Sequence, residues 1–426
     1  MHQLALYDQL THLPNRRRLI EHLQQQLTGR HDATNLIALL FINLDNFKEF
    51  NDAHGYSIGD ELLVQVANRL KEQVTGNDFI ARLGSDEFAY ICNCNTSDPA
   101  HARQHAIRIA RHIMQGITGE EYRIDSLRYR ASVCIGIAML DHPQLTAESA
   151  LKHADLALYE AKSIGRSHIS FFEPDMEAVV AARAALELEL RQAIEQRQFA
   201  LYYQPQVDAA GTLLGYEALV RWLHPIRGMV PPNSFIGLAE VTGLIIPLGD
   251  WILHTACTQL SRWNRQPDTS HLVLSVNISA RQLHHPEFVE RLERTLQETG
   301  ADPKRLELEL TESQLVTDME ATLAKMQALK AHGIRLSIDD FGTGYSSLNY
   351  LKRFPIDQIK IDQTFVRDLV IDANDMFIVK AIIEMGHNLN FTILAEGVET
   401  EAQCEALQKL GCFRFQGYLF GRPAPI

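Results

Sequence analysis

Residues 199–222 read FALYYQPQVDAAGTLLGYEALVRW and contain two strand-like apolar runs, Phe199–Val207 and Leu213–Trp222. Only Asp208–Thr212 separates the two runs. A crossover between parallel strands needs a dozen residues or more, whereas antiparallel strands can be joined by a short turn. The stretch therefore predicts that the first strand runs antiparallel to the strand that follows it.

Six further strand-like runs follow, and helical patterns separate most of them. They are Leu272–Ile278, Arg305–Leu310, Ile334–Asp340, Gln358–Asp362, Thr392–Ala395 and Phe413–Tyr418. Eight strands with intervening helices over roughly 230 residues fit a (β/α)8 barrel. Because of the short first connection, we expect a modified TIM barrel with an antiparallel first strand.

The residues before the barrel predict a second domain. Helical and strand patterns alternate over residues 1–172, which indicates an α/β domain with a mixed sheet ending near Phe172. Residues 173–198 are rich in Ala, Glu, Leu and Arg and contain no Gly, so they predict a helical linker. The expected division is therefore 1–172, 173–198 and 199–426.

Length and charge limit the function of the 426-residue chain. At roughly 100–200 residues per domain, two domains are expected. The net charge of −13 argues against long nucleic acid as a partner, since a non-specific polyphosphate binder is basic. Apolar stretches such as Leu36–Ile42 fall short of the ~20 residues of a membrane span. We expect a cytoplasmic segment without membrane contact, to which a longer protein would add sensory or membrane domains upstream.

Polar side chains gather at the carboxyl ends of seven successive barrel strands, which is where barrel active sites lie. So many acids would repel one another unless cations neutralised them. Oxygen ligands with one Asn favour Mg²⁺ or Mn²⁺, and two such ions about 3.5–4 Å apart are typical of phosphodiester hydrolysis. The residues are Glu217, Arg221, Asn277, Glu309, Glu312, Asp339, Asp340, Lys360, Asp362, Glu396, Glu399 and Gln416.

The same segments carry a resemblance to the EAL family of cyclic di-GMP phosphodiesterases, over essentially all of the second half. The matching motifs are YEALVRW (216–222), VNIS (276–279), ELTES (309–313), DDFGTGYSS (339–347), KID (360–362), EGVE (396–399) and QGY (416–418). The resemblance implies metal-dependent hydrolysis of cyclic di-GMP to linear pGpG, and it implies a homodimer formed through the barrel.

The resemblance also implies a role for each matching residue. The implied ligands of two Mg²⁺ or Mn²⁺ ions are Glu217, Asn277, Glu309, Asp339 and Asp340. Lys360 would hold or polarise the attacking water, and Glu396 would support the second metal or act as the base; which of these two takes the proton stays open. Substrate contacts are implied for Arg221, Asp362, Glu399 and Gln416. Glu312 would hold the 339–347 loop, whose Gly342 and Gly344 suit a regulatory role.

The first half is similar to the GGDEF family of diguanylate cyclases, with matches at DQLTHLPNR (8–16), Asn51-Asp52 with Gly59-Asp60, and Ala154-Asp155 through Gly165-Arg166. The signature turn, however, reads GSDEF (84–88), with Ser85 in place of the second glycine.

Further departures from the GGDEF pattern bear on activity. Asn43 replaces a metal-binding aspartate, Tyr56 stands where the family has His, and Thr75 replaces the arginine of the inhibitory motif that ends at Asp78. A neutral amide brings no charge to Mg²⁺, so we expect cyclase activity to be absent or very weak. The residues that remain for a GTP-binding regulatory or dimerising domain are Lys48, Asn51, Asp60, Asp86 and Glu87.

Two other functions remain as alternatives to a phosphodiesterase with an inactive cyclase domain. The chain could be a receptor that binds cyclic di-GMP without cutting it, or a bifunctional cyclase and phosphodiesterase. The complete set of metal ligands in the second half argues against the receptor, and Asn43 argues against the bifunctional enzyme.

Overall fold

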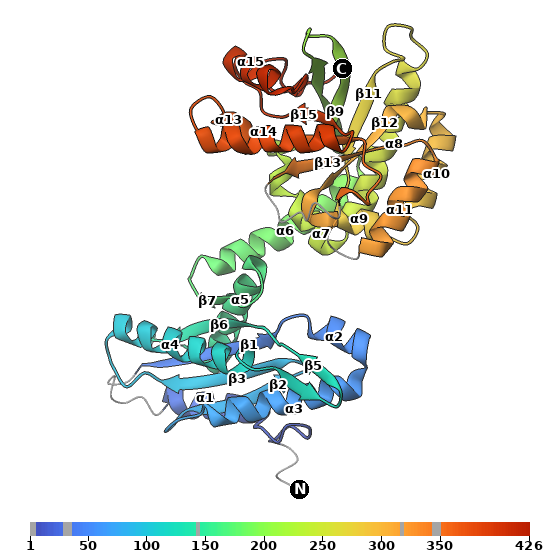
Figure 1. The fold of residues 1–426 in the computed structure, drawn as a ribbon. Helices are drawn as coiled ribbons and strands as arrows, with labels where there is room; N and C mark the ends of the chain where they lie inside the picture. The colour runs from blue at the N-terminus through green and yellow to red at the C-terminus, as the bar shows by residue number, and fades with distance from the viewer. Residues whose placement is uncertain (1–5, 29–35, 142–144, 316–318, 343–350) are drawn as a thin grey trace. The chain divides into compact units, whose positions relative to one another are not determined.

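The computed structural model describes residues 6–28, 36–141, 145–315, 319–342 and 351–426 (Figure 1). Two compact units make up the chain, Met1–Ala184 and Ala185–Ile426. The division falls inside one helix, α6 (Met176–Glu195), whose last turns bury Leu190 and Ala193 in the core of the second unit. The exact domain limits expected from the sequence stay a prediction.

The first unit is built on a mixed five-stranded sheet in the order β2-β3-β1-β6-β7, in which β6–β7 is parallel and the other pairs are antiparallel. All eight residues of β1 are buried, because helices cover both faces of the sheet. Helices α3 and α4 contribute to one buried cluster and α1 and α5 to the other. The elements are α1 (Arg16–Thr28), β1 (Ile37–Leu44), α2 (Phe47–His54), α3 (Tyr56–Glu72), β2 (Phe79–Gly84), β3 (Glu87–Asn93), α4 (Pro99–Thr118), β4 (Tyr122–Ile124), β5 (Leu127–Tyr129), β6 (Val133–Leu140), α5 (Ala147–Ile164) and β7 (Ile169–Phe171).

The second unit is a closed barrel in the strand order β9-β11-β12-β13-β14-β15-β16-β8, with β10 attached to the outer side of β9. Its strands are β8 (Phe199–Asp208), β9 (Leu213–His224), β10 (Gly228–Val230), β11 (Val273–Asn277), β12 (Leu306–Thr311), β13 (Arg335–Phe341), β14 (Gln358–Ile361), β15 (Thr392–Ala395) and β16 (Arg414–Gln416). The β8–β9 and β16–β8 pairs are antiparallel and the pairs from β9 through β11 to β16 are parallel. The expected antiparallel first strand and the modified (β/α)8 barrel are confirmed.

Helices surround the barrel strands. They are α7 (Ile236–Thr242), α8 (Ile245–Trp263), α9 (Ala280–His284), α10 (Phe288–Thr299), α11 (Met319–Ala331), α13 (Gln363–Arg367), α14 (Ala373–Asn388) and α15 (Glu401–Leu410). Short 3₁₀ turns cover Pro232–Ser234, Pro303–Arg305 and Glu312–Leu315. Among the described residues, no helix is both long and apolar enough to cross a membrane.

Side chains of opposite character alternate along the barrel strands. In β12, Leu306, Leu308 and Leu310 pack in the apolar core, whereas Glu307 and Glu309 are equally buried. Successive side chains of a strand point to opposite faces, so the two glutamates lie inside the barrel. A TIM barrel interior is ordinarily filled by branched apolar side chains; here acidic and amide side chains occupy it.

Candidate active site

Lys360 of β14 lies at the centre of a buried acidic cluster in the barrel. Its ammonium nitrogen lies 2.7 Å from Glu396 Oε1, 2.9 Å from Glu309 Oε2, 3.1 Å from Asp339 Oδ1 and 3.5 Å from Glu217 Oε2. Four strands other than β14, or the segments that follow them, supply these carboxylates, and the Lys360 side chain is fully buried. Only the closed barrel brings these groups together.

Amide side chains fix Glu217 from both sides. Asn277 Nδ2 donates to Glu217 Oε1 at 2.6 Å, and Gln416 Nε2 donates to Glu217 Oε2 at 2.5 Å. Gln416 is itself held by β8, since it donates to Gln204 and accepts from Gln206 at 3.1 and 2.9 Å. The antiparallel first strand therefore supports the orientation of a carboxylate on β9.

An irregularity in β13 concerns the consecutive residues Asp339 and Asp340. In a regular strand these side chains would point to opposite faces. Asp340 has φ 51°, and the β13–β14 register shifts between Ile338 and Phe341. This left-handed residue at a bulge lets both carboxylates reach the acidic cluster, an arrangement typical of functional sites.

Burial and mutual repulsion shift the titration of the cluster. Burial, reinforced by neighbouring negative charge, raises the pKa of Glu309 well above its usual value and that of Asp340 to about 6. Burial also raises the pKa of Glu396, despite the nearby ammonium. Burial opposes the charged forms of Lys360 and Glu217, but the surrounding carboxylates raise the pKa of Lys360, and Lys360 with two amides lowers that of Glu217. The cluster holds more negative charge than one lysine can balance.

Buried oxygens in the cluster suit a divalent cation. Neither Glu309 oxygen nor Asp339 Oδ1 has a hydrogen-bond donor within the described ranges, although Lys360 lies at ion-pair distance. Two groups of carboxylates, Glu217/Glu309/Asp339 and Asp339/Asp340/Glu396, each have ligand atoms within 4.8 Å of one another. Carboxylate oxygens with an adjacent amide are the donor set of Mg²⁺ or Mn²⁺. The residues fit a metal site.

A pocket of about 380 Å³ adjoins the cluster at Asn277 and Asp340. The segment between β9 and α8 contributes much of its wall. Pro232, Asn233, Ile236 and Glu240 come from this segment, and Leu219 of β9 lines the pocket as well. Apart from Leu219 in the EAL motif, sequence reasoning did not select these residues, because they carry no motif and reach the site only through folding of a long connection.

Family models match both units of the chain. The EAL domain model matches residues 187–423, and the model of the diguanylate cyclase GGDEF domain matches residues 5–168. The chain is a tandem GGDEF–EAL protein. Its two units are therefore called the GGDEF domain and the EAL domain below.

Relatives with this tandem organisation are longer. MucR of Pseudomonas aeruginosa is described as a bifunctional diguanylate cyclase/cyclic di-GMP phosphodiesterase. It is 44% identical over an alignment of 426 positions that covers 99% of this chain and 61% of MucR. The chain spans between 50% and 67% of the length of the curated relatives that we compared.

Two solved structures illustrate the likeness. The PaMucR phosphodiesterase in complex with c-di-GMP is 47% identical, with a TM-score of 0.55, and covers 57% of this chain and 98% of its own. The S helix-GGDEF-EAL structure of Vibrio cholerae LapD bound to c-di-GMP has a TM-score of 0.56 over 98% of this chain and 97% of its own. At 22% identity, the LapD likeness shows the fold alone.

The remaining expected EAL site residues lie in different surroundings. Arg221 donates to the carbonyl of Val220 and lies over the ring of Tyr202, away from the Lys360 contacts. Asp362 caps α13 by accepting from Thr364 N at 2.9 Å. It also lies beside Asp340, and its hydrogen bond and charge add to burial in raising the pKa of that carboxyl. The Glu399 side chain is exposed, so it lies outside the buried cluster.

The loop after β13 is anchored at its start. Glu312, which is buried, accepts from Gly342 N at 3.1 Å. Gly342 has φ 102°, and a Cβ there would lie 2.9 Å from Phe365 Cε2, so both conformation and space favour glycine. Gly344 and the rest of the expected regulatory loop up to Ser347 lie outside the described residues.

In the GGDEF domain, Asn43 is buried at the end of β1, opposite Glu87 of β3 in the register. Ser85 has φ 35°, and Arg82 holds its carbonyl with two hydrogen bonds of 2.6 and 3.2 Å. Asp86 precedes β3 in the same turn. Within the described part of this domain, no three His, Cys, Asp or Glu side chains converge as a metal site would require.

The expected nucleotide-binding residues of the GGDEF domain are close to the end of β1 in sequence. Lys48 and Asn51 lie on α2, and Asp60 lies on α3. Lys48 and Asp60 are exposed, whereas Asn51 Oδ1 is buried without a hydrogen-bond donor among the described residues. A Cβ on Gly59 would lie 1.8 Å from that oxygen, so glycine is what allows Asn51 its position.

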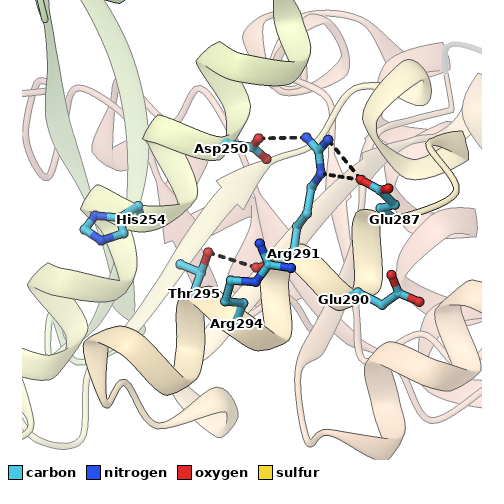
Figure 2. A pocket seen from close by; sticks show the side chains of 7 residues that line it. All are labelled: Asp250, His254, Glu287, Glu290, Arg291, Arg294 and Thr295. Carbon is cyan, nitrogen blue, oxygen red and sulfur yellow. Dashed lines mark hydrogen bonds and ion pairs between the residues drawn. The ribbon is translucent and has the colours of Figure 1, made fainter.

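A separate hollow of about 630 Å³ lies on the outer face of the barrel between α8 and α10 (Figure 2). Its charges largely satisfy one another: Arg291 lies 2.9 Å from Asp250 and 3.2 Å from Glu287. None of the predicted catalytic residues lines it. The acidic cluster inside the barrel is therefore the candidate active site.

Proposed function

We propose that the EAL domain hydrolyses cyclic di-GMP to linear pGpG with the help of two Mg²⁺ or Mn²⁺ ions. The observation that carries the proposal is the buried cluster in which Glu217, Glu309 and Asp339 surround Lys360. Within the described residues, both oxygens of Glu309 and Oδ1 of Asp339 lack a hydrogen-bond donor. Such a concentration of buried negative charge is unfavourable in itself and becomes useful when cations bind.

The proposed metal ligands are Glu217, Asn277, Glu309, Asp339 and Asp340. Bound cations would polarise the phosphate oxygens and lower the pKa of a coordinated water. The substrate carries two phosphodiesters, which these charges would otherwise repel. The domain therefore needs the metal for binding as well as for the chemical step.

The chain's own residues handle the attacking water. The carboxylates around Lys360 raise its pKa, so it keeps its proton and acts as a hydrogen-bond donor that holds the water oxygen. Glu396, 2.7 Å from Lys360, accepts the proton that the water loses. The water oxygen then bonds to phosphorus as the bond to the 3′ oxygen breaks. The released 3′ oxygen takes a proton from solvent and becomes a hydroxyl, which leaves a linear dinucleotide with a 5′ phosphate.

Substrate contacts are assigned to the rim of the barrel. Arg221 carries a guanidinium that can bind phosphate or a guanine edge through its fork of donors. The pocket beside Asn277 and Asp340 offers an apolar wall for a base. Binding of c-di-GMP by the PaMucR phosphodiesterase supports this choice of substrate. Glu399, being exposed, is the weakest of the expected contacts.

The test is nucleotide chromatography after incubation with cyclic di-GMP and Mg²⁺ or Mn²⁺. We expect pGpG from the intact chain and none from Glu217→Gln, which keeps the size of the side chain but removes its charge. Tight binding of unchanged cyclic di-GMP in saturating metal would favour the alternative of a non-catalytic receptor.

We further propose that the GGDEF domain is inactive as a cyclase and binds GTP as a regulatory module. The neutral, buried Asn43 opposite Glu87 supports the loss of a metal site. The buried oxygen of Asn51 supports a remaining base-binding position. Incubating Glu217→Gln with GTP tests the first point: cyclic di-GMP formation would establish the bifunctional alternative, as described for MucR. An unchanged hydrolysis rate across a GTP range would refute the regulatory role.

Dimerisation through the barrel is proposed from exposed apolar side chains in the first turns of α14 and in the segment just before it. Ile371 and Phe377 are 84% and 73% exposed, and Val370 and Met376 lie beside them in the sequence. Apolar groups this exposed favour contact with another apolar surface. A second copy, related by a two-fold axis, would cover them with the same patch.

A further inference from the structure

Beneath the acidic cluster lies a second polar network inside the EAL barrel, centred on Glu307 of β12. Glu307 is 1% exposed. Its Oε1 accepts from Ser275 Oγ at 3.0 Å and from Gln358 Nε2 at 2.9 Å, and its Oε2 lies 3.2 Å from Arg335 Nε. Arg414 Nη1 donates to Gln358 Oε1 at 3.5 Å. These residues, called the Glu307 network, come from β11, β12, β13, β14 and β16.

The network crosses the barrel interior. Gln358 belongs to β14, which is not a neighbour of β12 in the sheet, so its bond to Glu307 spans the width of β13. Ser275 and Arg335 face Glu307 directly in the register of the two adjacent strands. One carboxylate therefore ties together four strands of the barrel.

Each network residue of these four strands precedes a residue of the candidate active site on the same strand and on the same face. In three of the four pairs the two residues are two positions apart, a span of about 6.6 Å, so they are neighbours on the inner face of their strand. In β13, Ser337 lies between the paired residues Arg335 and Asp339 and is in register with Glu309. The pairs, with the network residue first, are Ser275 and Asn277, Glu307 and Glu309, Gln358 and Lys360, and, four residues apart, Arg335 and Asp339. The network holds each strand at one position along the barrel axis. That position determines how far along the axis the active-site side chain of the strand lies.

A buried carboxylate at this position is not explained by stability. Replacing a buried ion pair by apolar side chains of similar volume is often neutral or stabilising, and barrel interiors ordinarily use such side chains. The best-documented role of buried polar groups is to select one register between neighbouring elements over the alternative registers. Register matters here because four strands must align their active-site side chains.

We propose that Glu307 is a positioning residue that sets the relative heights of Asn277, Glu309, Asp339 and Lys360 in the EAL active site. It does not touch substrate or metal and acts through the strands that it joins. The inference rests on the proposed phosphodiesterase function for its kinetic effect, but its effect on metal binding can be measured without turnover.

The experiment compares Glu307→Leu with Glu307→Gln in the full chain, by kcat, KM, Mn²⁺ dissociation constant and thermal midpoint. For Glu307→Leu we expect a loss of roughly 10- to 100-fold in kcat and in Mn²⁺ affinity, the size typical of residues that orient metal ligands. At Mn²⁺ concentrations that saturate each variant, KM for cyclic di-GMP should stay within about twofold, because the substrate contacts of Arg221 are untouched. Glu307→Gln, which keeps an acceptor for Ser275 and Gln358, should recover most of the loss.

The matched control is Leu292→Ala on α10, which creates a cavity in the same domain outside the barrel interior. It should lower the thermal midpoint while kcat and Mn²⁺ affinity stay unchanged. If Glu307→Leu behaves like this control, Glu307 is merely structural and the proposal is wrong. Should Glu307→Leu not fold, Gln358→Met is judged by the same criteria: it removes the bond from Glu307 to β14 and the long bond from Arg414, and it leaves the contacts of Glu307 with β11 and β13.

The same measurements separate failure of this inference from failure of the proposed function. If the unmodified chain releases no pGpG, the phosphodiesterase proposal fails, and the Mn²⁺ dissociation constants still decide on Glu307. If the unmodified chain is active and both Glu307 variants match it in kcat and metal affinity, only the positioning role is refuted.

Discussion

The ammonium nitrogen of Lys360 lies 2.9 Å from Oε2 of Glu309, and neither side chain is exposed to solvent. A buried ion pair of this kind stabilises a fold only when each charge is well compensated. Lys360 also lies within 3.5 Å of Glu217, Asp339 and Glu396, so one positive charge serves four carboxylates. The remaining negative charge is what a divalent cation would neutralise.

Replacing Lys360 should lower the stability of the EAL domain more in the absence of metal than in its presence. Lys360→Met leaves the surrounding carboxylates without their cation, and breaking a buried pair in this way costs about 3–5 kcal/mol. All three tryptophans, Trp222, Trp251 and Trp263, belong to the EAL domain, so their fluorescence during urea unfolding reports this domain. Added Mn²⁺ should recover part of the stability and none of the turnover. An unchanged urea midpoint in EDTA would contradict the expectation.

Metal affinity should fall at acid pH. A metal binds the ionised carboxylates, and burial raises the pKa of Asp340 to about 6 and that of Glu309 above its usual value. Protons therefore compete with Mn²⁺, and the affinity for Mn²⁺ weakens as the pH drops through about 6. Electron paramagnetic resonance of free Mn²⁺ between pH 5 and 8 measures the change in Mn²⁺ affinity.

The stability of the metal-free domain depends on pH in the opposite direction. Folded Asp340 binds its proton more tightly than the unfolded chain does, so its contribution to stability is lost as the pH rises from about 4 to 6.

Ser85→Gly should stabilise the β2–β3 turn of the GGDEF domain. Ser85 has φ 35°, a conformation that costs an L-residue about 1–2 kcal/mol and glycine almost nothing. Allowing for the greater freedom of glycine in the unfolded chain, the net gain is about 0.5–1 kcal/mol. Slower hydrogen exchange in β2 and β3 of the full chain would show it. The control Ser57→Gly, on the exposed surface of α3, should instead speed exchange in its helix.

Glu312 should influence turnover through the loop that follows β13. Its carboxylate accepts from Gly342 N at 3.1 Å, and Glu312→Ala would leave that N–H without its partner. We expect a reduction of roughly 10-fold in kcat with an unchanged Mn²⁺ dissociation constant. Glu312→Gln retains an acceptor oxygen, so its kcat should lie between that of the unmodified chain and that of Glu312→Ala. Equal kcat values for the unmodified chain and both variants would show that the contact between Glu312 and Gly342 does not influence turnover.

Oligomeric state should respond to a single charge in the apolar patch. Phe377→Glu places a carboxylate on α14 where the side chain is 73% exposed, so it leaves folding intact and repels a second copy. Sedimentation at micromolar concentration is expected to show a dimer for the unmodified chain and a monomer for the variant. The control Lys380→Glu, one turn further along α14, adds negative charge without removing an apolar side chain. Monomers from both variants would point to a charge effect without a specific apolar interface.

Local features of the amino-acid sequence are enough to predict most of the strands and the motifs that carry the chemistry. The short segment Asp208–Thr212 is enough to predict an antiparallel β8–β9 pair, because turn length is a local property. The alternation in β12 and the position of Glu309 at its end follow from the two-residue period of a strand. The motifs of both halves predicted the families that the chain matches.

How these residues meet depends on the folded domain and could not be read from the motifs. The left-handed conformation of Asp340, the four carboxylates around Lys360 and the exposed side chain of Glu399 depend on how far each strand is shifted along its neighbours. The Glu307 network depends on the same shift, and Glu307 carries no mark that distinguishes it from a surface glutamate in the sequence. Strand period and loop length are local, whereas register and barrel closure are set by the packing of the whole domain.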